Sequence, residues 1–166
     1  MNEATSLDPE TAARAFALER HGGQRYGDAP YVVHLEAVRA VLADFGLGGA
    51  LGVAAWLHDV LEDTPTSRAE LEGRFGAEVG ALVWAVTGEG RNRRERARSM
   101  HEKIRAWPAA APLKLADRIA NVEASRARPD KLALYRAERE SFRRALGALG
   151  DPAMWARLDR AFDEGR

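Results

Sequence analysis

Four side chains that can bind a metal ion or transfer a proton lie close together in the sequence: His58, Asp59, Glu62 and Asp63. They follow an apolar segment, residues 51–57, and we interpret them as the end of the same buried helix. Residues four apart share a helix face, so His58 is expected above Glu62 and Asp59 above Asp63. On the expected helix, these two pairs lie on neighbouring ridges, so one pair can face an ion and the other a substrate.

The alternative is that Glu62 and Asp63 only solvate the end of that helix. Carboxylates in a last turn face the negative end of the helix dipole, at a cost of about 0.3–1 kcal/mol each. A divalent cation nearby removes this objection. Capping of the next helix stays open as an alternative for Asp63.

Two more positions interrupt apolar segments: His34 and Asp117. A lone His on an apolar face is more often a hydrogen-bonded core residue than a ligand. A buried carboxylate without a partner costs several kcal/mol, and Arg118 points about 100° away from Asp117 on a helix. Together with His58 and Asp59, these residues would form a site of two imidazoles and two carboxylates, which suits Mn, Fe or Zn.

Several strings resemble the hydrolase domain of the Rel/Spo family, within the HD superfamily of metal-dependent phosphohydrolases: GQRYGDAPYVVH, AAWLHDVLEDT and LKLADRIANV. The similarity covers about residues 10–125 in the family's order. It implies hydrolysis of the 3′-pyrophosphate of ppGpp, with Mn²⁺ as the usual ion and another divalent ion possible. By position, it makes the metal ligands His34, His58, Asp59 and Asp117. It makes Glu62 and Asp63 the catalytic acidic pair.

The resemblance also implies that Asn121 contacts the nucleotide and that Arg25 packs near the base. The sequence departs from the family at this loop, where Tyr26 replaces the usual Lys, and Leu35 replaces the usual Pro. The loop from Gln24 to Pro30 is also one residue shorter. Guanine specificity is therefore left open, and adenosine alarmones or the 2′-phosphate of NADPH are alternative substrates. A non-catalytic nucleotide sensor is a third hypothesis.

A highly anionic substrate needs cations. We predict that Asn92 and Arg93 meet phosphates at the start of a helix, where backbone N–H groups are free. Lys114, three residues before Asp117, is predicted to flank the site, and Arg136 to close over the nucleotide. The Arg-rich stretch 91–98 is equally well explained as a solvated helix face.

The whole composition limits the class of protein. The chain has 166 residues, with 25 Lys and Arg against 25 Asp and Glu, and it has no Cys. A neutral net charge argues against nucleic acid as partner, and the absence of Cys excludes thiolate metal sites. We expect one domain over residues 1–166 in the cytoplasm, without a signal peptide or membrane span, and with a small-molecule nucleotide as partner. The sequence does not determine the oligomeric state.

The elements that must position these residues are expected to be helices throughout. Hydrophobic periodicity fits 3.6 residues per turn and Ala and Arg dominate, so we predict an all-α fold. Breaks at Gly and Pro, with Asp or Ser caps, divide the chain. The expected helices span about 9–21, 32–45, 51–63, 68–75, 78–87, 93–107, 113–125, 129–149 and 152 onward.

Overall fold

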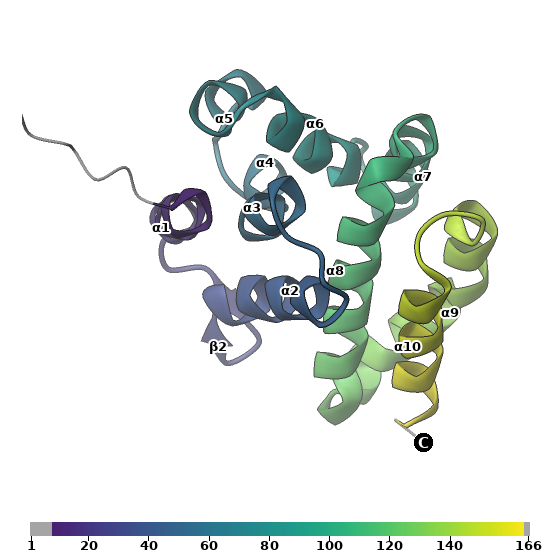
Figure 1. Ribbon diagram of the computed structural model, residues 1–166. Coiled ribbons are helices and arrows are strands. Elements are labelled where there is room, and N and C mark those ends of the chain that lie inside the picture. The colour runs from purple at the N-terminus through teal and green to yellow at the C-terminus, as the bar shows by residue number, and fades with distance from the viewer. Residues whose placement is uncertain (1–7, 165–166) are drawn as a thin grey trace, which may run out of the picture.

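The computed structural model describes residues 8–164, and it confirms the all-α prediction (Figure 1). The single-domain prediction over 1–166 includes residues 1–7 and 165–166, which lie outside the described residues. The α-helices are α1 (Pro9–His21), α2 (Val32–Asp44), α3 (Ala50–Leu57), α4 (Val60–Asp63), α5 (Arg68–Phe75), α6 (Ala77–Val86), α7 (Arg93–Ala106), α8 (Ala111–Ala124), α9 (Pro129–Leu146) and α10 (Pro152–Asp163). Short 3₁₀ turns, η1 (Pro108–Ala110) and η2 (Ser125–Ala127), flank α8.

Local sequence explains most helix starts. The Asp8 carboxylate accepts a hydrogen bond from the Thr11 amide at 3.0 Å, which caps α1. Ser67 caps α5 in the same way, accepting from the Glu70 amide at 3.1 Å. In α10 the N-cap is Asp151. The caps explain why the predicted starts of these helices agree with the structure.

Helix α8 occupies the middle of the molecule (Figure 1). It packs against α2 and α3 on one side and against α9 and α10 on the other. Its buried residues are almost continuous along the helix, and they include two neighbouring charged residues, Asp117 and Arg118. A carboxylate on this helix therefore reaches the centre of the fold rather than the solvent.

The structure corrects the predicted helix over 51–63. α3 ends at Leu57 and α4 begins at Val60, with Asp59 at φ −103° and ψ −3° between them. On a continuous helix, neighbouring side chains diverge by about 100°. The break instead lets the adjacent residues His58 and Asp59 face the same point.

A short antiparallel hairpin is the second difference from the prediction. Strands β1 (Arg25–Tyr26) and β2 (Ala29–Pro30) pair within the segment expected to be a plain loop. Gly27 lies at the turn with φ +58°, a backbone conformation that favours glycine.

Among residues 8–164, no helix is long and apolar enough to cross a membrane.

Candidate metal centre and catalytic site

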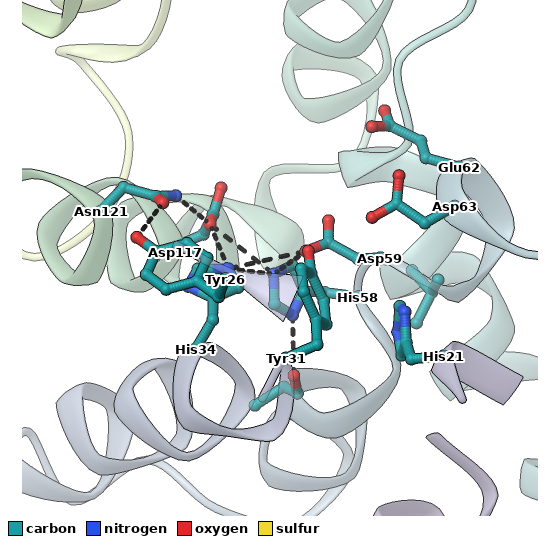
Figure 2. A network of polar contacts seen from close by, with 12 residues as sticks. His21, Tyr26, Tyr31, His34, His58, Asp59, Glu62, Asp63, Asp117 and Asn121 are labelled. Carbon is teal, nitrogen blue, oxygen red and sulfur yellow. Dashed lines mark hydrogen bonds and ion pairs between the residues drawn. The ribbon is translucent and has the colours of Figure 1, made fainter. Parts of the chain in front are cut away.

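Four side chains from α2, the α3–α4 break and α8 converge on one point (Figure 2). The Nε2 atoms of His34 and His58 lie 3.2 Å apart. Asp59 Oδ2 lies 3.0 Å from His58 Nε2 and 3.5 Å from His34 Nε2. Asp117 Oδ1 lies 3.2 Å from His34 Nε2 and 3.6 Å from His58 Nε2. The four residues predicted as ligands are thus brought together from distant parts of the chain.

This donor set fits a divalent ion. His58 Nδ1 lies 2.7 Å from the carbonyl oxygen of Ala55, which can only accept, so the Nδ1–H donates and leaves the Nε2 lone pair for an ion. His34 and His58 are buried, so His34 is a core residue as well as a candidate ligand. The donor atoms of His34, His58 and Asp59 lie within 4.8 Å of one another, and Asp117 Oδ1 lies near both Nε2 atoms; imidazoles with carboxylates suit Mn, Fe or Zn.

The electrostatics of the centre favour positive charge. Burial disfavours charge on Asp117, but the Lys114 ammonium, 2.6 Å from Oδ2, and the two imidazoles hold the pKa of that carboxyl well below its usual range. Burial likewise opposes charge on His58, yet Asp59 and Asp117 raise the pKa of that imidazole. Lys114, which the sequence analysis placed beside the site, forms an ion pair with Asp117. It lies three residues away on the same helix face.

Glu62 and Asp63 lie beside this centre, next to Asp59, and are not among the four converging side chains (Figure 2). The structure keeps Asp59 and Asp63 one helical turn apart, because the Asp63 amide donates to the Asp59 carbonyl at 3.0 Å, whereas His58 lies at the end of α3 and Glu62 lies in α4. Glu62 accepts a hydrogen bond from the Gly88 amide, and burial raises the pKa of its carboxyl.

Asp63 does not cap the following helix, because Ser67 does so. Its Oδ2 instead accepts a hydrogen bond from Gln24 Nε2 at 3.0 Å, and Gln24 also contacts His21 Nδ1 at 2.9 Å. The segment before the hairpin thus reaches one of the two candidate catalytic acids.

The hairpin segment comprises β1, β2 and the following residue, Tyr31. Its tyrosines, Tyr26 and Tyr31, contact residues of the site, and the sequence analysis did not predict these contacts. The Tyr31 hydroxyl donates to Asp59 Oδ2. Tyr26 stacks on His34 with ring centroids 4.7 Å apart and 14° between planes. The presence of Tyr26 where the family usually has Lys was the feature of the sequence that could have indicated this residue. Only the fold shows that its ring contacts His34.

The predicted nucleotide contacts Arg25 and Asn121 both line a cavity of about 220 Å³. Tyr26 and Tyr135 lie in its wall, together with further cations from α9 and the turn before it. Arg25 is exposed and its guanidinium donates to the Asp28 carbonyl. Asn121 is occupied by protein partners, because its Nδ2 donates to Asp117 Oδ1 at 2.7 Å.

Arg93 and Lys114 line a second cavity, of about 180 Å³, next to Glu62. Arg96 and Arg118, which were not predicted, lie in the same wall. Arg93 and Arg118 are each paired with Glu138.

The remaining two predicted contacts lie elsewhere. Asn92 is exposed and caps α7, accepting from the Glu95 amide at 2.9 Å. Arg136 does not close over either cavity in this structure, since its guanidinium donates to the Phe162 carbonyl of α10 at 3.1 Å. The reason is helical geometry: Arg136 follows Tyr135 by one position and so points about 100° away from it.

Comparison with known proteins gives the family context. A family model described as the HD domain matches residues 13–143. A guanosine-3′,5′-bis(diphosphate) 3′-pyrophosphohydrolase from Aquifex aeolicus is 40% identical over 117 residues, which are 67% of this chain and 17% of the relative. A probable enzyme of the same name from Synechocystis is 42% identical over 76 residues, 45% of this chain and 10% of the relative. This chain therefore spans less than a fifth of the length of either relative.

A solved structure also resembles the chain over its length. It is described as a metazoan ortholog of SpoT that hydrolyzes ppGpp and plays a role in starvation responses. The TM-score is 0.79, with 23% identity, and the match covers 99% of this chain and 98% of that one. At this identity the match establishes the fold.

Proposed function

This chain belongs to the HD domain family, and on that premise we propose that it is a metal-dependent hydrolase that removes pyrophosphate from the 3′ position of a ppGpp-like nucleotide. The observation that carries the proposal is the convergence of His34, His58, Asp59 and Asp117 beside Glu62, next to cavities lined by Arg and Lys. We also propose that the chain acts in the cytoplasm, without nucleic acid as a partner.

The four converging residues would hold the ion, and Mn²⁺ is our first candidate. When bound, a divalent ion polarises the phosphoryl group and lowers the pKa of a coordinated water. Two neutral imidazoles and two carboxylates neutralise its charge. Lys114 contacts the other oxygen of Asp117, Oδ2, at 2.6 Å and helps to keep that carboxyl ionised.

Glu62 and Asp63 would act on the attacking water. Both face a cavity of about 660 Å³ that also holds Arg68 and Arg96. A carboxyl works best as a general base when its pKa approaches the working pH, and burial moves the pKa of Glu62 in that direction. We assign Glu62 the proton of the attacking water, which it then gives to the leaving 3′ oxygen, and Asp63 the orientation of that water.

The two smaller cavities would divide the substrate between them. Arg93, Arg96 and Lys114 border Glu62 and suit the phosphates at the reacting end. Tyr26 and Tyr135, with Arg25 at the rim, suit the nucleoside. Tyr26 in place of a Lys also keeps the adenosine compounds and NADPH as candidate substrates.

A substrate panel tests the proposal. Metal-stripped protein receives Mn²⁺ and then ppGpp, pppGpp, ppApp, pppApp or NADPH, and released pyrophosphate and phosphate are measured. We expect pyrophosphate from the guanosine compounds, and none from the Asp59→Ala variant. Release from adenosine compounds alone would change the substrate, and release of phosphate from NADPH alone would make the protein a phosphatase. Bound metal without turnover of any compound would overturn the proposal.

A further inference from the structure

Two tyrosines of the hairpin segment are connected by hydrogen bonds to the two carboxylates of the proposed metal centre (Figure 2). Tyr31, after the second strand, donates directly to Asp59 Oδ2. Tyr26, in the first strand, donates to Asn121 Oδ1 at 2.7 Å, and Asn121 Nδ2 donates to Asp117 Oδ1 at 2.7 Å. The two hydroxyls thus reach the two carboxylates by separate routes.

The direction of the longer route follows from hydrogen-bond chemistry. An ionised carboxylate only accepts, so the Asn121 group that faces Asp117 must be its NH₂. The Asn121 carbonyl then faces Tyr26, and the phenol must be the donor. Asp117 Oδ1 is also the oxygen that faces both imidazoles. The series of hydrogen bonds from Tyr26 therefore ends on the carboxylate oxygen that faces the proposed ion site.

The Tyr26 ring adds a second constraint. Its flat stack on His34 leaves the His34 imidazole little freedom to turn. His34 Nδ1 is buried and has no hydrogen-bond partner among residues 8–164, so no partner at that nitrogen fixes the ring. Packing against Tyr26 therefore takes the place of the hydrogen bond that usually orients a metal-binding His.

We propose that the hairpin positions the metal ligands: Tyr31 orients Asp59 directly, and Tyr26 orients Asp117 through Asn121. This rests on the proposed role of the two carboxylates as ligands. Asn121 is then a link between the hairpin and the centre in addition to any contact with a nucleotide. Tyr26 and Tyr31 are positioning residues, because neither contacts the reacting atoms.

The test measures Mn²⁺ affinity of the metal-stripped protein by calorimetry. Tyr26→Phe and Tyr31→Phe each keep the ring and remove one hydroxyl. We expect each to weaken Mn²⁺ binding about 10-fold, the lower end for changes to groups that orient ligands. The two hydroxyls act on different carboxylates, so their effects should multiply. The Mn²⁺ affinity of the double variant should therefore fall about 100-fold.

The relay itself is tested by a second pair. Tyr26 acts through Asn121, so Tyr26→Phe should cause no further loss in the Asn121→Ala background. A raised KM with unchanged Mn²⁺ affinity would instead assign Tyr26 to substrate binding alone and overturn the inference.

Tyr135→Phe is the matched control for removal of a phenol. Its ring lies beside Arg93 and Arg118, with their guanidinium carbons 5.9 and 5.1 Å from the ring centroid. Its Mn²⁺ affinity should equal that of the wild type. Thermal unfolding in the presence of a chelator checks that every variant folds.

The outcomes separate this inference from the proposed function. Wild-type Mn²⁺ affinity in Tyr26→Phe and Tyr31→Phe, with an active wild type, would overturn the inference and leave the function standing. A multiplicative loss in Tyr26→Phe/Asn121→Ala would overturn the relay. A wild type that binds no Mn²⁺ or other divalent ion would overturn both proposals.

Discussion

At the scale of single residues, the proposed chemistry depends on side chains that are buried yet ionisable. His58 is 3% exposed and sits between two carboxylates, and Asp117 is 7% exposed and sits beside Lys114. Buried charges of this kind are tolerated only when paired. Glu62 differs, because it reaches solvent at a cavity wall and its nearest polar contact is a backbone amide.

Glu62→Gln is expected to separate catalysis from metal binding. As a general base, Glu62 must be ionised, so kcat/KM should fall as pH decreases through its pKa, which burial raises above 4.5. The variant should lose about 10²–10⁴-fold in kcat and also lose this acidic limb, since Gln does not titrate. The measurement is a pH–rate profile at verified Mn²⁺ saturation. An unchanged acidic limb in the variant would show that another group carries the proton.

At the scale of elements, the site depends on short connections between helices. The break between α3 and α4 brings His58 and Asp59 together, and the hairpin between α1 and α2 meets α8. A third connection, between α6 and α7, supplies the Gly88 amide to Glu62. A Cβ on Gly88 would lie 2.8 Å from both the Cβ and the carbonyl oxygen of Arg96.

Gly88→Ala should therefore displace this connection from α7. We expect a loss of stability of about 1–3 kcal/mol from overpacking, together with reduced kcat, because the amide moves away from Glu62. Gly73→Ala is the control, since a Cβ there meets no atom within 4 Å and Ala favours the helix. Urea unfolding and steady-state kinetics measure both effects. Equal stability and activity in the two variants would contradict the role given to Gly88.

The packing of α7 on α9 predicts a pH dependence of stability. His101 lies against Phe142, and burial together with the charges of Lys114 and Arg118 lowers its pKa from 6.5 to about 4. Between these values the unfolded chain binds the proton and the folded protein does not, so stability falls as pH decreases from 6.5 towards 4.

His101→Gln should flatten that part of the stability curve. The measurement is the free energy of unfolding in chelator from pH 4 to 8, taken as the difference between wild type and variant. The difference cancels contributions from the ligand imidazoles, which both proteins share. A difference that stays constant over this range would contradict the lowered pKa of His101.

At the scale of the whole molecule, the four proposed ligands join segments that are far apart in the sequence. His34 lies on α2 and Asp117 on α8, with α3 and α4 between them in the chain. An ion bound only by the folded arrangement stabilises it by about 2.7 kcal/mol at 100 times the dissociation constant.

Metal removal should consequently lower the melting temperature. For a chain of this size, about 2.7 kcal/mol corresponds to roughly 5–10 °C. Scanning calorimetry with and without Mn²⁺ measures the shift, and Asp117→Asn serves as the control with a much smaller response. A shift of equal size in the control would mean that Mn²⁺ stabilises the fold at another place.

The sequence by itself indicated most of the helices and the four side chains that converge at the centre. Helix starts are local, because caps such as Ser67 act within one turn, and His34 and Asp117 attract notice because charge is costly in an apolar segment. The proposed roles of these residues, and those of Arg25 and Arg93, stay predictions.

Only the tertiary structure decided which groups meet. The contact of Tyr26 depends on a neighbour distant in the chain, Asn121 on α8. Local preferences contain no information about such contacts, since packing overrides them. The tertiary fold alone places the Tyr26 hydroxyl next to Asn121, and it turns Arg136 towards α10.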